Sequence, residues 1–223
     1  MKVKTWLVGF SALCVVGCSQ NYSSEKGDVA MAEKGFTPVP KGTIDENLES
    51  RQTKAEGLES AMKNGQRQDL GGISVVMPSG WEQMSPSNQM RLAEYRLPGG
   101  LVKAADAVLT VFHFGRGQGG AVDANIERWY GQFTQVDGTN TRSKARRWQK
   151  VIQGIEVHWV DISGEFSGGM GSEPVANARM LGVIAEASAG AFFFKVVGPI
   201  QTINHWEASF EQYVASFRDP ETL

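Results

Sequence analysis

The chain has 223 residues, 41% of them hydrophobic and 21% charged, with a formal net charge of −2. This mildly acidic balance excludes a general nucleic-acid-binding protein, which would carry a net basic surface. The only two cysteines are Cys14 and Cys18. Because both lie close to the N-terminus, the rest of the chain contains no thiol for a nucleophile, a disulfide or a zinc–thiolate site.

Residues 1–17 have the layout of a secretory signal. Lys2 and Lys4 precede an apolar stretch that runs from Trp6 to Val16. This stretch is about half the length needed to cross a hydrocarbon core of ~30 Å, so it does not predict a stable membrane span. Loss of this segment would change the formal net charge from −2 to −4.

The end of this segment, Val-Val-Gly-Cys at Cys18, resembles the lipobox of bacterial lipoproteins. The resemblance implies cleavage before Cys18 and attachment of acyl chains to that residue, so that lipid would hold the protein on a membrane. By analogy with lipoprotein sorting, Ser19 implies the outer membrane, facing the periplasm. The alternative is an ordinary signal peptide in which the cysteine is incidental.

Residues 18–70 are rich in Ser, Glu, Lys, Gly, Gln and Asn and contain few large apolar side chains. Such a segment buries too little surface to offset the entropy lost on ordering, and we interpret it as a flexible tether. A helix over 45–62 would be marginal, because its apolar positions are sparse and irregularly spaced.

The composition of residues 71–219 predicts a single folded domain of ordinary size. Alternating apolar residues predict a strand over 72–77, which ends at the turn signal Pro78-Ser79-Gly80. Further strands are expected over 90–97 and 105–114. The last of these is apolar on both faces, which indicates a central strand in a sheet that is covered on both sides.

The remainder of the chain predicts two helices and two strand pairs. Apolar residues at helical spacing indicate helices over 122–133 and 203–217. Strands over 142–151 and 155–166 would meet near Gly154, and 178–187 with 191–197 would form a hairpin. Short turns favour antiparallel pairing. The expected fold class is therefore α+β, with a mainly antiparallel sheet and helices packed on it.

The order of these elements, with Pro78-Ser79-Gly80-Trp81 after the first strand and a C-terminal helix, resembles the PsbP-like α/β/α sandwich. Four segments also resemble a group of uncharacterised bacterial lipoproteins: Pro78–Trp81, Arg91–Tyr95, Phe112–Gly115 and Asn125–Trp129. The resemblance implies a fold but no activity, because neither group supplies a catalytic motif that matches residues here.

A glycine-rich turn follows the strand over 105–114. Gly115, Gly117 and Gly120 satisfy the dinucleotide-binding pattern G-x-G-x-x-G. The context argues against a dinucleotide, since the segment after the next helix is too polar for a buried parallel strand. A backbone anion site at Gly117, Gly119 and Gly120 is a weaker alternative to a plain flexible turn.

Five cations lie between Arg142 and Lys150. On a strand, Arg142, Lys144, Arg146 and Trp148 would share one face, where they could bind an anionic glycan, phosphate or lipid headgroup. The alternative, which we favour, is a solvated edge strand whose charges prevent pairing with other chains.

No catalytic residue, metal site or cofactor is predicted. The three histidines, His113, His158 and His205, do not have the spacing of metal ligands, and hydrolase signatures are missing. The first hypothesis is therefore a lipid-anchored, non-enzymatic binding or scaffold protein of the cell envelope, with an envelope protein or anionic glycan as partner. The second is an anion- or small-molecule-binding protein that uses residues 142–150, and the third is an uncharacterised hydrolase.

Overall fold

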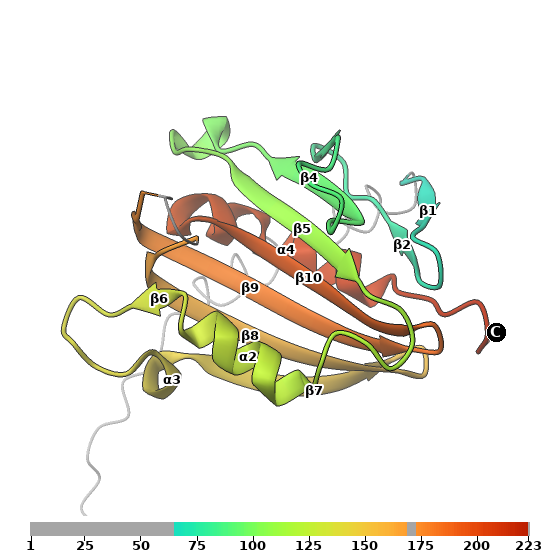
Figure 1. Cartoon of the computed structure of the whole chain (residues 1–223). Helices are drawn as coiled ribbons and strands as arrows, with labels where there is room; N and C mark the ends of the chain where they lie inside the picture. The colour runs from blue at the N-terminus through green and yellow to red at the C-terminus, as the bar shows by residue number, and fades with distance from the viewer. Residues whose placement is uncertain (1–64, 169–172, 223) are drawn as a thin grey trace, which may run out of the picture. The chain divides into compact units, whose positions relative to one another are not determined.

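The computed structural model describes residues 65–168 and 173–222. Figure 1 shows a twisted sheet with helices on both faces. The main sheet has the strand order β3-β4-β5-β10-β9-β8-β6, and β7 also pairs with β8. Its strands are β3 (Glu82–Met84), β4 (Ala93–Leu97), β5 (Ala107–His113), β6 (Phe133–Thr134), β7 (Arg146–Ile152), β8 (Ile155–Phe166), β9 (Val175–Ala187) and β10 (Gly190–Pro199).

Every described pairing in this sheet is antiparallel. A separate pair is formed by β1 (Arg67–Asp69) and β2 (Ser74–Val76). The helical elements are η1 (Gly100–Val102), α2 (Val122–Tyr130), α3 (Thr141–Lys144) and α4 (Ile200–Ala215). The prediction of an α+β fold with a mainly antiparallel sheet is confirmed.

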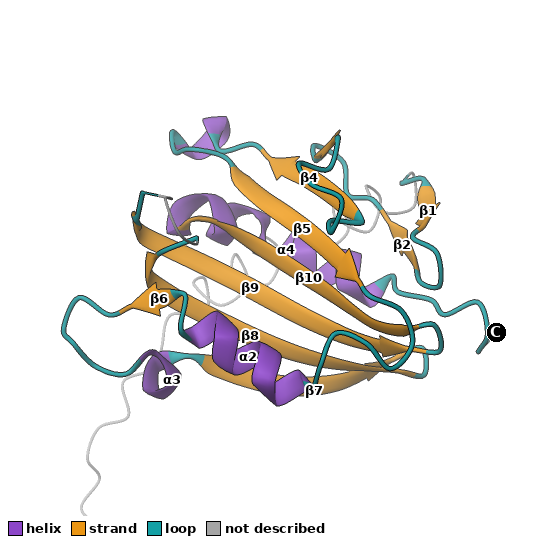
Figure 2. Ribbon diagram, viewed as in Figure 1, coloured by secondary structure: helices purple, strands orange, loops and turns teal. Residues whose placement is uncertain are grey.

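Successive side chains of the central strands point to opposite faces of the sheet, and this alternation produces two hydrophobic cores. In β10, Phe192 and Phe194 face one side and Phe193 faces the other. The first side is covered by α4, whose Phe210 and Tyr213 are fully buried. The second side is covered by α2 through Ile126 and Trp129. The result is three layers, α/β/α, with α4 behind the sheet and α2 in front of it in Figure 2.

One glycine lets α2 approach the sheet closely. Gly182 lies in β9, and a Cβ added there would lie 2.6 Å from the ring of Trp129 on α2. Tertiary packing therefore requires the absence of a side chain at this position, since the Trp129 ring already occupies the space.

Three sequence predictions need correction. The expected tether extends too far, because β1 lies within 18–70 and the side chain of Leu70 is buried in the core. The strand over 142–151 begins only at Arg146, since residues 141–144 form α3, with the Asn140 side chain accepting a hydrogen bond from the backbone N–H of Arg142. Phe133 belongs to β6 and not to the helix before it.

The short strand β3 was not predicted, because Glu82-Gln83-Met84 has no apolar alternation. The other expected strands and both expected helices are confirmed within a few residues. Cys18, the signal segment and most of the tether lie outside the described residues. Among the described helices, none combines the length and the apolar character that a membrane span requires.

Candidate functional site

A cavity of about 580 Å³ lies on the face of the sheet that carries α2. This volume is in the range of small-molecule sites. We call it the Lys195 cleft. Its walls come from β4, β5, β9 and β10 and from segments near β6 and β8, and it is lined by Arg91, Glu94, Ala105, Asp106, Val108, Thr110, Phe112, Gln132, Phe166, Gly168, Val175, Lys195, Val197, Gly198 and Pro199.

Lys195 is the central charged group of the cleft. It lies on β10 between Phe194 and Val196, which face the opposite core. Its Nζ donates a hydrogen bond to Oε1 of Gln132 at 2.6 Å and lies 4.9 Å from the ring centroid of Phe166. In the described part of the chain, no carboxylate lies within ion-pair distance of this ammonium group.

Burial lowers the pKa of Lys195 to about 8, and repulsion from Arg91 and Arg128 adds to the effect. Burial disfavours the charged form of an amine, and neighbouring positive charges act in the same direction. The ammonium group of Lys195 is thus partly desolvated and has no carboxylate partner of its own among the described residues, so a negative charge beside it would be favourable.

The two carboxylates that line the cleft are already engaged. Glu94 is buried, forms an ion pair with Arg91 and accepts a hydrogen bond from the backbone N–H of Ser87 at 2.8 Å. Asp106 accepts a hydrogen bond from the N–H of Gly99 at 2.8 Å and pairs with Arg96. These contacts are typical of carboxylates that hold loops in place, and they leave Lys195 as the cationic centre.

The apolar part of the lining gives the cleft a mixed character. Val108, Phe112, Phe166, Val175 and Val197 all contribute to its wall. A site that combines an apolar wall with one uncompensated cation fits a small molecule that has an anionic group and an apolar portion.

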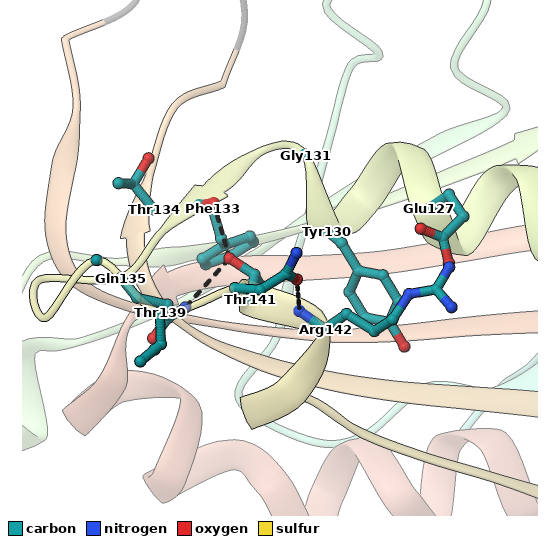
Figure 3. A pocket seen from close by; sticks show the side chains of 11 residues that line it. Glu127, Tyr130, Gly131, Phe133, Thr134, Gln135, Thr139, Thr141 and Arg142 are labelled. Atoms are coloured by element: carbon teal, nitrogen blue, oxygen red, sulfur yellow. Dashed lines mark hydrogen bonds and ion pairs between the residues drawn. The ribbon is translucent and has the colours of Figure 1, made fainter.

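A second cavity, of about 420 Å³, lies between the C-terminal end of α2 and the segment that leads into α3 (Figure 3). Its polar groups largely bond to one another. Arg142 pairs with Glu127, and Thr141 Oγ1 donates to the carbonyl of Phe133 at 2.9 Å. Gln135 Nε2 donates to the carbonyl of Ser163 at 2.8 Å. These mutual contacts make this cavity the weaker candidate for a ligand.

The structure does not bring Arg142, Lys144, Arg146 and Trp148 together on one strand face. Arg142 and Lys144 belong to α3 and pair with Glu127 and Asp137 respectively. Arg146 and Trp148 do share a face of β7.

On that face, Arg146 pairs with Asp161, and its Cζ lies 5.9 Å from the Trp148 ring centroid. The Trp148 ring also stacks on Trp159, with the centroids 5.4 Å apart. Of the predicted anion-binding group, Arg146 and Trp148 are thus the two that the structure brings into contact on one strand face.

The glycine turn between β5 and α2 is a tight connection. Gly117, Gly119 and Gly120 all have positive φ angles, which favour glycine. The side chain of Asn125 donates to the carbonyls of Gly119 and Ala121 at 2.8 and 2.9 Å. Because β5 is antiparallel to both neighbours, the turn does not belong to the parallel βαβ unit that a dinucleotide site requires.

Sequence reasoning missed the Lys195 cleft, although one signal was present. Lys195 is the only charged residue in the run from Ala191 to Val197, and a lone lysine in an apolar strand is unusual. The approach of Arg91 and Arg128 to it depends on long-range contacts, which local sequence patterns do not reveal.

No protein-family model matches the chain, and no curated protein matches it in sequence. It is similar to several solved structures. One is PA94 of Pseudomonas aeruginosa, a protein of unknown function, with 15% identity, a TM-score of 0.40, and coverage of 68% of this chain and 94% of that one.

The cyanobacterial PsbP protein (CyanoP) of Synechocystis sp. PCC 6803 is 12% identical, with a TM-score of 0.44 and coverage of 69% and 91%. A protein from Bacteroides thetaiotaomicron is 12% identical, with a TM-score of 0.41 and coverage of 70% and 48%. All three TM-scores are below 0.5.

Proposed function

We propose that this chain is a lipid-anchored binding protein of the bacterial cell envelope, and that its folded domain binds a small anionic molecule in the Lys195 cleft. The proposal keeps the non-enzymatic binding role that the sequence favours. It places the ligand at Lys195 and not at residues 142–150, whose cations at positions 142, 144 and 146 pair with carboxylates.

A single observation carries the ligand class. Lys195 is a largely buried cation with a neutral hydrogen-bond partner and two cationic neighbours. Enclosing a charge without a counter-charge is unfavourable. An anion that enters the cleft would supply that counter-charge, while its apolar portion would contact Phe112, Phe166 and Val197.

The ligand class is tested by calorimetric titration of the full chain with hexanoate as probe and hexanamide as uncharged control. The chain carries Cys18→Ala, which keeps it out of membranes. Hexanoate should bind and hexanamide should bind at least about tenfold more weakly, since a charged hydrogen bond is worth ~1.5–3 kcal/mol. Hexanoate binding should also weaken as the pH rises through about 8, where Lys195 loses its proton.

Lys195→Met should reduce hexanoate affinity by about tenfold or more. The matched control is Lys150→Met, which removes an exposed lysine on β7. Equal affinity in wild type and Lys195→Met, or an equal loss in both variants, would refute a ligand site at Lys195.

The envelope location rests on the Val-Val-Gly-Cys motif at Cys18. In bacteria that are fed a palmitate analogue, the wild-type chain should be labelled and Cys18→Ala should not. Acyl chains gain ~0.8 kcal/mol per buried CH₂, so more than one chain would keep the protein on the membrane. Absence of label on the wild type would refute the anchor and would leave the test of the Lys195 cleft unaffected.

A further inference from the structure

Glu156 and Glu186 lie directly opposite one another on neighbouring strands. They are a register pair of β8 and β9, so both side chains project from the same face of the sheet. Like charges at directly opposed positions destabilise a sheet. The other cross-strand neighbours are Val151 for Glu156 and Ala191 for Glu186, neither of which offers a compensating charge.

His158 completes the group. It follows Glu156 on the same face of β8, and it is buried, with only 8% of its surface exposed. Its Nε2 lies 3.0 Å from Oε2 of Glu186 and 3.6 Å from Oε1 of Glu156. One ligand atom from each of the three residues lies within 4.8 Å of the other two.

These separations suit a bound metal ion. Zinc bonds to imidazole nitrogen and carboxylate oxygen at about 2.0–2.2 Å, so ligand atoms at tetrahedral angles lie about 3.3–3.5 Å apart. The two distances from Nε2 lie on either side of this spacing, so a small rotation of either glutamate side chain would bring its oxygen to the required distance. One imidazole with two carboxylates is also a ligand set that divalent transition metals accept.

The surroundings provide support and access. Gln149, the register partner of His158 on β7, donates a hydrogen bond to Oε1 of Glu156 and thereby orients that carboxylate. The glutamate side chains are each 47% exposed. Solvent can therefore reach the ligand atoms, and a water molecule can fill the fourth position of a tetrahedral ion.

We propose that Glu156, His158 and Glu186 form a binding site for one divalent transition-metal ion of the zinc class. The ion neutralises the opposed glutamates and links β8 to β9, near the turn that precedes β8 and the turn that follows β9. The site is independent of the Lys195 cleft, since none of its three ligands lines that cavity.

The test is titration of the chelator-treated full chain, carrying Cys18→Ala and no histidine tag, with Zn²⁺ and then with Mn²⁺ and Mg²⁺. We expect saturable binding of one Zn²⁺ per chain and much weaker binding of Mg²⁺, which prefers all-oxygen ligands. Glu186→Gln and His158→Gln should each weaken Zn²⁺ binding at least about tenfold, because each removes a ligand. His205→Gln, which removes an exposed histidine on α4, should have no effect.

Thermal unfolding separates a metal site from an internal ion pair. Without metal, Glu186→Gln should melt at or above the temperature of the wild type, because it removes the repulsion between the opposed glutamates. Saturating Zn²⁺ should raise the wild-type melting temperature and have little effect on the variant. Failure of Zn²⁺ to saturate the wild type, unchanged affinity in both ligand variants, or a loss of stability in metal-free Glu186→Gln would overturn the proposal.

Discussion

Arg179 of β9 and Asp161 of β8 form a buried ion pair with two parallel hydrogen bonds. Nε of Arg179 lies 3.0 Å from Oδ1 of Asp161, and Nη2 lies 3.0 Å from Oδ2. The side chains are 8% and 6% exposed. Arg179 also donates to Asn204 and Glu207 on α4, so the pair fastens that helix to the sheet.

Replacing Arg179 with methionine should destabilise the domain by about 3–5 kcal/mol, because it leaves a buried carboxylate with one remaining cationic partner. That remaining partner is Arg146, whose side chain is 67% exposed. Arg146→Met should therefore cost less than about 1 kcal/mol. Urea unfolding measures both changes, and similar losses in the two variants would contradict this ranking.

The same ion pair predicts that the stability of the domain depends on pH. Burial by itself raises the pKa of Asp161, but hydrogen bonds from Arg179 and Arg146 outweigh it and leave the pKa lowered. The pKa of an unfolded aspartate is about 3.9. Because the folded-state pKa lies below this value, the stabilisation is fully present above pH ~4 and is lost as the pH falls through the folded-state pKa.

Asp161→Asn should therefore reduce the free energy of unfolding most at neutral pH, and its difference from the wild type should shrink as the pH falls below about 4. Unfolding curves for both proteins between pH 2.5 and 7 test this expectation. A difference that stays constant over that range would show that the charge of Asp161 contributes nothing.

Gly182→Ala tests the docking of α2 on the sheet. The added methyl group would lie 2.6 Å from the Trp129 ring, and the resulting shift should cost about 1–3 kcal/mol. Gly100→Ala is the matched control, since an added Cβ there meets no atom within 4 Å. A melting temperature of Gly182→Ala equal to that of the control would mean that α2 is not held close to β9.

Periodic apolar residues predicted most of the fold. The strand β5 could be found because a strand that is buried on both faces is apolar at most positions. The helix α4 could be found because a helix that is buried on one side carries apolar residues at helical spacing. The turn at α3 was misread because alternating Arg and Lys suit a strand face as well as a short helix. The Asn140 cap was the local signal that separates the two.

The sites were less accessible to sequence reasoning. His158 and Glu186 are adjacent only because β8 and β9 pair in one particular register, and a shift of one residue would place them on opposite faces. Lys195 likewise acquires its cationic neighbours from α2 and from the segment before β4. Register and long-range packing set these contacts, and hydrophobic periodicity does not encode them.

Tyr213 of α4 is fully buried, and its hydroxyl has no hydrogen-bond partner among the described residues. Burial raises the pKa of this hydroxyl well above its usual value, with a smaller contribution from Tyr95. An unsatisfied buried hydroxyl costs about 1–3 kcal/mol. Tyr213→Phe should therefore raise the free energy of unfolding by about 1 kcal/mol, as measured in urea.

Tyr95→Phe is the control for this substitution. The Tyr95 hydroxyl donates to Oε1 of Gln68 at 2.7 Å, so its removal should lower stability by about 1 kcal/mol. The two substitutions delete the same atom from equally buried rings and should change stability in opposite directions. Destabilisation by both would indicate that the Tyr213 hydroxyl has a partner in solution.

The basic residues before and within β7 provide the last prediction. Arg142, Lys144 and Arg146 are each paired with a carboxylate, and their side chains are 64%, 46% and 67% exposed. The pairs of Arg142 and Lys144 are exposed, and the buried Asp161 keeps Arg179 as a partner when Arg146 is replaced. Each change should therefore cost less than about 1 kcal/mol, and changing all three to glutamine should alter stability little. Hexanoate binding at Lys195 should also be unchanged, while self-association should rise because the β7 edge loses protective charge.

Sedimentation checks whether these cations bind a polyanion. The wild-type and triple-variant chains are each mixed with lipopolysaccharide, peptidoglycan or anionic vesicles over a range of salt concentrations. We expect no salt-dependent difference, since their carboxylate partners already balance them. Two results together would instead make this edge the ligand site. Wild-type binding would weaken as added salt screens charges over about 8–10 Å, and the triple variant would not bind.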